Sequence, residues 1–254
     1  MNGVTANSRV VDLFDNYFEL MPASNEHLKL EVYKLRYQVY CLETGFESPE
    51  KCQTAFDTEG RRVYYEIDEF DVRSSHYLIR HRASRLYAAT TRLILPDKDN
   101  IDAPFPIEIY CDLSEAIVRS EARCKVGEIS RYAISKEFKK RAGESGTLAG
   151  VSRNIEMYDI PHEQRVLPHL SMALFAGLVI MSRENGILYW YAVMEPALLR
   201  LMHRYGIHFK VIGPVVDYHG TRVPCVITVD EMLVNVKKCN YPIWELITGG
   251  GKYI

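Results

Sequence analysis

The sequence has no apolar run long enough to cross a membrane and no excess of charge of either sign. No stretch reaches the ~18 apolar residues that a spanning helix needs, and residues 1–20 lack the uninterrupted apolar segment of a secretory signal. Lys and Arg number 31 and Asp and Glu number 33, so the formal net charge is only -2. No overall field favours nucleic acid or an anionic membrane. We therefore expect a cytoplasmic protein with no transmembrane segment and no nucleic-acid partner.

Cysteine and histidine are present, but not at metal-binding spacings. The six cysteines include no C-x-x-C pair, and none of the eight histidines stands at the spacing of a zinc site. No cysteine stands with an obvious histidine and orienting acid, so a cysteine nucleophile is not indicated. We expect reduced thiols, no metal site and no tightly bound cofactor.

Repeats, low-complexity blocks and Pro/Gly/Ser-rich linkers are also missing, which indicates a single domain over residues 1–254. The chain is 47% apolar, enough for a substantial core. Two segments stand apart from this core. Residues 137–165 are charged and contain glycine, which favours an exposed insertion, and residues 249–254 ("GGGKYI") favour a loose C-terminal tail.

Hydrophobic periodicity and turn residues predict a β-α-β-β-β-α-β-α-β-β order and thus an α/β fold, a mixed sheet with helices on both faces. A helix follows candidate caps at Ser24 and Asn25, and a later one ends at Gly186. Residues 44–63 carry no periodicity and read as a long loop. The predicted strands lie at 16–23, 76–82, 85–96, 125–135, 187–194, 209–218 and 222–229, and the other helices at 28–39, 169–185, 196–206 and from Asp230.

The segment "VGEISRYAIS" (126–135) reads as a buried strand, yet it contains an acid and a base, Glu128 and Arg131. Positions three apart on a regular strand point to opposite faces, so these two side chains cannot simply pair across one face. Either the strand bends or each residue has a different partner. The alternative is that both lie at a solvated sheet edge, since charged groups are seldom buried without partners.

Four further charged residues have ordinary explanations when each is taken alone. Arg36 interrupts the apolar pattern of the first helix, where an arginine can extend along the surface to reach water. Asp68 and Asp71, in "IDEFD", stand just before the hairpin, where a turn or helix cap is expected. Arg92, in "TTRLILP", could be an outward-facing strand residue.

Taken in order, these residues resemble the signature of the acyl-homoserine-lactone synthase family. The pattern is an Arg with aromatics four and ten residues later, then D-x-x-D, R-L-x-L-P and E-x-S-R, over roughly residues 30 to 135. The resemblance implies a fold like that of the GCN5-related N-acetyltransferases (GNAT), three α/β/α layers around a mixed, mostly antiparallel sheet. The signature falls on Arg36, Tyr40, Phe46, Asp68, Asp71, Arg92, Glu128 and Arg131, with Phe105 as a further family aromatic.

The second half resembles the PEP-CTERM/exosortase system-associated acyltransferases, a branch that shares this fold with N-acyl amino acid synthases. The resemblance is carried by "RENGILYWYAVMEPALLRLMHRYGIHFKVIGPVVDYHGTRVPCVI", with "RYQVYCLETGFE", "PFPIE" and "WELIT". It implies an enzyme that moves a fatty acyl group from an acyl carrier protein or coenzyme A thioester to the amine of a small amino-acid-like acceptor. Many lactone synthases have Trp where this chain has Phe46, so the acceptor need not be S-adenosylmethionine.

The donor site departs from the wider fold. Acetyl-CoA-using members hold the pyrophosphate on an R/Q-x-x-G-x-G/A turn at a helix start, and "FKKRAGESG" imitates it only loosely. A carrier protein depends less on that turn and is itself acidic. Lys136, Lys139, Lys140 and Arg141 could face such a carrier, although a solvated basic stretch is the simpler alternative.

The chemistry implied by the resemblance gives roles to these residues. Glu128 would accept the proton of the attacking amine, and Arg131 beside it would hold it in place. For the fatty chain we expect an apolar channel, with ordinary core packing as the alternative for each member: Met172, Phe175, Val179, Trp190 and Tyr191. Two other functions stay open, an acetyl-CoA-dependent N-acetyltransferase and a non-catalytic module that binds acyl chains or a carrier protein.

Overall fold

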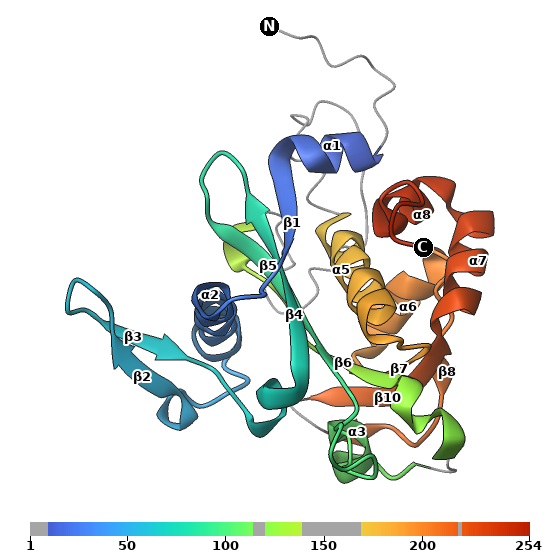
Figure 1. The fold of residues 1–254 in the computed structure, drawn as a ribbon, viewed down its shortest axis with the longest axis horizontal. Coiled ribbons are helices and arrows are strands. Elements are labelled where there is room, and N and C mark those ends of the chain that lie inside the picture. Colours follow the sequence, from blue (N-terminus) through green and yellow to red (C-terminus); the bar gives the residue numbers. More distant parts are fainter. Residues whose placement is uncertain (1–9, 114–119, 139–168, 218–219) are drawn as a thin grey trace, which may run out of the picture.

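The computed structural model describes residues 10–113, 120–138, 169–217 and 220–254, and its centre is a twisted sheet (Figure 1). The strand order is β1-β4-β5-β6-β7-β10-β8, with β9 also pairing with β10. Among the described strands of this sheet, every neighbouring pair is antiparallel except β6 with β7, which is parallel. The strands are β1 (Phe18–Pro22), β4 (Ser74–His81), β5 (Tyr87–Ile94), β6 (Val126–Ile134), β7 (Tyr189–Met194), β8 (Lys210–Val211), β9 (Val216–Asp217) and β10 (Thr221–Thr228).

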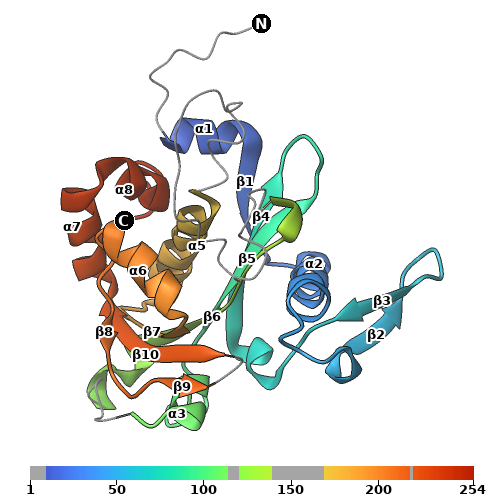
Figure 2. The same cartoon turned by 180° about the vertical axis from the view of Figure 1, so that it is seen from behind.

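Helices cover both faces of this sheet, as the sequence predicts (Figures 1 and 2). On one face α2 (Glu26–Tyr37) packs against β4 and β5, and on the other α5 (Leu170–Asn185) packs against the same strands. Helices α1 (Val10–Tyr17) and α7 (Val229–Cys239) both pack against α8 (Tyr241–Thr248), which packs on α5. Two short helices, α3 (Pro106–Tyr110) and α6 (Pro196–Arg204), lie beside β7 and β10.

Local signals explain where the two principal helices begin and end. The side chain of Asn25 accepts a hydrogen bond from the backbone N–H of Leu28, so α2 is capped as predicted. Helix α5 ends at Gly186, whose φ of 66° is left-handed and suits glycine. Because α5 is sandwiched between the sheet and α8, it is apolar on nearly all sides. No helix of the described residues is long and apolar enough to cross a bilayer.

Several short elements differ from the sequence predictions. The predicted loop 44–63 contains the first strand of a hairpin, β2 (Gln53–Phe56) with β3 (Arg62–Tyr65), which projects beyond α2 (Figure 1). All four residues of β2 are exposed, so no apolar alternation marked it. Helices α1 and α3 were also not predicted as helices.

The C-terminal residues do not form the expected loose tail. Backbone hydrogen bonds join Gly250 to Glu245 and Tyr253 to Thr248, and Tyr253 packs against the main core. Of the expected insertion at 137–165, only residues 137 and 138 are described, and Phe138 is buried.

Strands β6 and β7 pair over only part of their length, which opens the sheet. Their register runs from Val126 with Tyr189 to Ile129 with Ala192, and no pair follows although both strands continue. At the same level β6 bulges, because Thr90 pairs with Ala133 while Arg92 pairs with Ser130. Two residues of β6 therefore face one residue of β5. One of them, Arg131, has a φ of 49° in the left-handed region, which confirms that this strand bends.

Candidate active site

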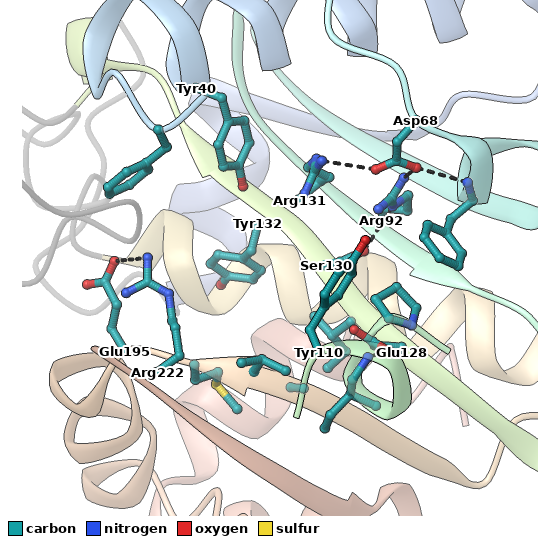
Figure 3. Close-up of a pocket in the computed structure, with 18 of the residues that line it drawn as sticks. Tyr40, Asp68, Arg92, Tyr110, Glu128, Ser130, Arg131, Tyr132, Glu195 and Arg222 are labelled. Atoms are coloured by element: carbon teal, nitrogen blue, oxygen red, sulfur yellow. Dashed lines mark hydrogen bonds and ion pairs between the residues drawn. The ribbon is translucent and has the colours of Figure 1, made fainter. Parts of the chain in front are cut away.

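A cavity of about 220 Å³ lies where β6 and β7 separate (Figure 3). Its wall combines charged residues from the segment before β4 and from β5 and β6 with apolar residues from α5, β7 and α6. Seven of the residues singled out in the sequence line it: Tyr40, Phe46, Asp68, Arg92, Glu128, Arg131 and Phe175. The fold thus brings together groups that are far apart in the chain.

Arg36 and Asp71 lie buried behind this wall and hold its charged part in place. Arg36 Nη1 donates to Asp71 Oδ1 at 2.7 Å, and Arg92 Nη1 donates to the same oxygen at 2.9 Å. Arg92 Nη1 also reaches Asp68 Oδ1 at 2.6 Å, and Arg131 Nη2 lies 3.0 Å from Asp68 Oδ2. Three guanidinium groups therefore share these carboxylates in one network.

The two aspartates also cap the short 3₁₀ helix Glu69–Arg73. Asp68 accepts from the backbone N–H of Phe70, and Asp71 accepts from that of Asp68. Each aspartate therefore both caps this helix, as the sequence predicts, and binds arginines of the charged network. A carboxylate has enough acceptor positions for both tasks.

Glu66 completes the network, and sequence reasoning missed it. Its carboxylate accepts from Arg36 Nε and, at 2.9 Å, from Arg131 Nη2. Burial by itself would raise the pKa of Glu66, but the charges of Arg36 and Arg131 outweigh burial and lower the pKa to about 2. The signal that could have found it is an acid directly after the β-rich run 62–65, two residues before Asp68.

Glu128 is buried beside this network but is not part of it. Its Oε2 accepts from the backbone N–H of Ile107 at 2.9 Å, and its side chain forms no ion pair with any described residue. Burial raises the pKa of Glu128 to about 8, although the Ile107 hydrogen bond and the charge of Arg92 oppose the rise. A carboxylate with this pKa can exchange a proton near neutral pH.

Arg131 does not hold Glu128 in place, as the resemblance implied; each of the two residues has its own partners, as the sequence allowed. Arg131 bonds to Glu66 and Asp68, and its guanidinium lies 5.4 Å from the ring centre of Tyr40. The β6 bulge lets both residues line the cavity while each has its own partners. The cations whose charges lower the pKa of Glu128 are Arg92 and, more weakly, Arg73.

The apolar part of the wall differs from the expected channel. Phe175 lines the cavity, but the other four expected residues do not. Residues Met172, Val179 and Trp190 are packed in the main core, and Tyr191 belongs to a second buried cluster with Phe105. Ordinary packing, the alternative named above, describes these four. The apolar wall is formed by Ile129, Phe175, Ala192, Met194 and Leu198.

Phe105 is also outside the cavity wall and has a supporting position. It is 1% exposed, and the guanidinium groups of Arg73 and Arg123 lie 5.1 and 5.5 Å from its ring centre. It directly precedes α3, the helix whose Ile107 N–H bonds to Glu128. Phe105 therefore helps to place the group that holds Glu128.

Two cavity residues that the sequence did not reveal lie away from the Glu128 end. Arg222 of β10 and Glu195, just before α6, form an ion pair at 3.4 Å (Figure 3). Both lie within the stretch 183–227 that carries the second resemblance, but nothing in the sequence singles them out, and they are 27 positions apart by their residue numbers. Only the pairing of β10 with β7 brings them together.

The predicted carrier-binding residues are largely outside the described part of the chain. Lys136 is exposed, and its backbone N–H donates to Glu43. Lys139, Lys140 and Arg141 lie outside the described residues, as does most of the segment compared with the pyrophosphate turn. No cluster of His, Cys, Asp or Glu suited to a metal ion is found among the residues that are described.

Comparison with known proteins identifies the fold. Residues 35–149 match the model of the acetyltransferase (GNAT) domain, Acetyltransf_5. The chain is similar to the crystal structure of TofI in a ternary complex with an inhibitor and MTA, with 19% identity, a TM-score of 0.56, and coverage of 87% of this chain and 96% of that one. No curated protein sequence matches the chain.

Two further solved structures agree with this result. The CoA-dependent acyl-homoserine lactone synthase BjaI, with SAM and isopentyl-CoA, has 15% identity, a TM-score of 0.53, and coverage of 89% of each chain. FeeM, an N-acyl amino acid synthase from uncultured soil microbes, has 10% identity, a TM-score of 0.51, and coverage of 88% of this chain and 97% of that one. The protein has a GNAT-like α/β fold with a mixed, mostly antiparallel sheet, which confirms the predicted fold class.

Proposed function

We propose that the protein is an N-acyltransferase that moves a fatty acyl group from an acyl-phosphopantetheine thioester to the amine of a small amino-acid-like acceptor. The observation that carries the proposal is Glu128, a buried carboxylate with a pKa of about 8 in the wall of a cavity at the opening of the sheet. One part of that wall is charged and another is apolar, as two such substrates require. The names of BjaI and FeeM, an acyl-homoserine lactone synthase and an N-acyl amino acid synthase, support this reading.

The reaction is a direct displacement in a complex with both substrates. The amine nitrogen attacks the thioester carbonyl, the new C–N bond forms, and the C–S bond breaks after the tetrahedral intermediate. Glu128 accepts the proton that the amine loses, directly or through one water. The thiolate leaves without a strong acid, since an ordinary thiol has a pKa of about 8.5.

The charged network positions the acceptor. Asp68 is the least buried of its three central carboxylates, with a side chain 18% exposed against 6% for Glu66 and 3% for Asp71. It faces the cavity and can bind the cationic part of the acceptor before proton loss. Arg36, Glu66 and Asp71 fix Asp68 and Arg131 in place, because each bond of the network restricts its neighbours.

The donor is proposed to be an acyl carrier protein, with acyl-CoA as the alternative source of the same thioester. The exposed Lys136 follows β6 directly and would contact an acidic carrier. We also propose, from the sequence resemblance, a cytoplasmic enzyme that serves an exosortase-associated system. No tightly bound cofactor is needed for the displacement.

Product analysis tests the proposal. The protein is incubated with acyl carrier protein and CoA thioesters of several chain lengths and a pool of amino acids and amines, and small-molecule products are identified by mass spectrometry. We expect lipidated amines from the wild type and a loss of about 10²- to 10⁴-fold in rate for Glu128→Gln. Products that are only acetylated would instead indicate the acetyl-CoA-dependent N-acetyltransferase. Absence of turnover, with acyl binding unchanged in Glu128→Gln, would indicate a binding module.

A further inference from the structure

Arg222 is a buried cation with an incomplete set of partners at one end of the cavity (Figure 3). The residue is 8% exposed. Its Nη2 lies 3.4 Å from Glu195 Oε1 without forming a hydrogen bond, and its Nη1 donates to the Thr221 carbonyl at 3.1 Å. The guanidinium also lies 5.7 Å from the ring centre of Phe46. An arginine has five N–H donors, and most of those on Arg222 have no hydrogen-bond partner among the described residues.

The other two cations of the described cavity wall are already committed. Arg92 bonds to Asp68 and Asp71 at 2.6 and 2.9 Å and to Ser130 at 2.9 Å. Arg131 bonds to Glu66 and lies 3.0 Å from Asp68. An anionic group entering the cavity would have to compete with two carboxylates at Arg92 and with three at Arg131, where Glu47 also lies 3.6 Å away. At Arg222 it would meet one carboxylate, 3.4 Å away and not hydrogen-bonded, and a planar guanidinium suited to bidentate binding.

The strand register separates Arg222 from Glu128. Glu128 pairs with Tyr191 of β7, whereas Val223 pairs with Met194, which places Arg222 at the level of Glu195. Tyr191 and Glu195 are four residues apart in the chain. At ~3.3 Å per strand residue, the backbone levels of Glu128 and Arg222 are therefore about 13 Å apart along the strands. Figure 3 shows Tyr132 between the two groups. At this separation of backbone levels, an acceptor that spans Glu128 and Arg222 carries its amine and its carboxylate several atoms apart.

We propose that Arg222 binds the carboxylate of an acceptor whose amine is separated from that carboxylate by several atoms. Acceptors of this class are ω-amino acids, basic amino acids acylated on the side-chain amine, and dipeptides. Glu195 is then the counterion that the carboxylate replaces, and in the free enzyme it keeps the buried guanidinium from being unpaired. This inference rests on the proposed function and adds the acceptor class to it.

A series of acceptors tests the spacing. With one acyl donor at saturation, kcat/KM is measured for glycine, γ-aminobutyrate and ε-aminocaproate, and for n-hexylamine as the matched acceptor without a carboxylate. We expect kcat/KM to rise along the amino acid series. In Arg222→Gln the ratio of kcat/KM for ε-aminocaproate to that for n-hexylamine should fall by about 10- to 100-fold, the value of a charge-assisted hydrogen-bonded contact.

Two further variants sharpen the test. Glu195→Gln removes the competing carboxylate, so the KM for ε-aminocaproate should fall. Arg200→Gln, at an exposed position of α6 outside the cavity wall, should leave the ratio unchanged. Circular dichroism and unfolding temperature establish that Arg222→Gln is folded.

The outcomes separate this inference from the proposed function. If no amine is acylated by the wild type, the proposed function fails. If amines are acylated but glycine is used at least as well as ε-aminocaproate, or the ratio is the same in Arg222→Gln, only the inference is overturned. It is also overturned if Arg222→Gln raises the KM of the donor with every acceptor, because Arg222 would then bind a donor phosphate.

Discussion

At the scale of single residues, Glu128 shows how burial and function oppose each other. A carboxylate that is 3% exposed and pairs with no described cation is costly to ionise, and the raised pKa is the measure of that cost. Its one backbone hydrogen bond, from Ile107, does not compensate. A carboxyl group with this pKa suits the base that the proposed function requires.

Glu128 should make the folded protein less stable as pH rises. Its folded-state pKa of about 8 is above the ordinary value of 4.5, so the folded state binds this proton more tightly than the unfolded state. The associated stability is fully present below pH 4.5 and is lost as pH rises toward 8. At about 1.4 kcal/mol per pKa unit, the loss is of the order of 5 kcal/mol.

Urea unfolding of wild type and Glu128→Gln at pH 5 and pH 9 measures this effect. The free energy of unfolding of Glu128→Gln minus that of the wild type should be more positive at pH 9 than at pH 5. Equal pH dependence in the two proteins would show that Glu128 does not titrate as described.

At the scale of elements, the charged network joins α2, the end of the β2–β3 hairpin, the 3₁₀ helix before β4, and strands β5 and β6. Arg36 comes from α2, Arg92 from β5 and Arg131 from the bulge of β6. Glu66 connects α2 to β6 through Arg36 and Arg131. Buried ion pairs therefore tie the segment after the hairpin, which carries Glu66, to α2 and β6.

Removing Glu66 should be far more damaging than removing a surface partner. Glu66→Gln leaves the fully buried Arg36 without one of its carboxylates, and we expect a loss of about 3–5 kcal/mol in the free energy of unfolding. The matched control is Glu19→Gln. Glu19 of β1 pairs with Arg80 of β4 at 2.6 Å, but its side chain is 34% exposed. An exposed ion pair of this kind contributes at most about 1 kcal/mol to the free energy of unfolding.

Chemical denaturation at pH 7 compares these two variants directly. Acid titration provides a second measurement. Because the pKa of Glu66 is lowered to about 2, the stability that ionised Glu66 gives the folded protein is present above pH 4.5 and is lost as pH falls toward 2. A loss in Glu66→Gln no larger than in Glu19→Gln would refute the buried network.

At the scale of the whole molecule, the sequence predicts most of the sheet and the principal helices because their signals are local. The cap at Asn25, the stop at Gly186 and the apolar runs of β5 and β7 each depend on neighbours in the chain. The exposed hairpin strand β2 has no such signal and was missed. Marginal and solvent-facing elements are those that tertiary contacts decide.

The site could be predicted only where a family resemblance supplied an order of residues. Nothing in the sequence singles out Glu66, Glu195 or Arg222, although the last two lie in the stretch that carries the second resemblance. The cavity that they border or support depends on pairing between distant strands. The expected channel failed for a related reason. Apolar residues on α5 and β7 look alike in sequence, whether they face a cavity or the core.

The most direct test of the account is the pH dependence of kcat/KM for acyl transfer. An acceptor whose amine is fully deprotonated over the range is used, so that only the enzyme titrates. The account predicts that kcat/KM rises with pH through a midpoint near 8, the pKa of Glu128, and that the residual rate of Glu128→Gln shows no such rise. A wild-type profile that is flat through this range, or the same midpoint in Glu128→Gln, would contradict the claim that Glu128 accepts the proton of the amine.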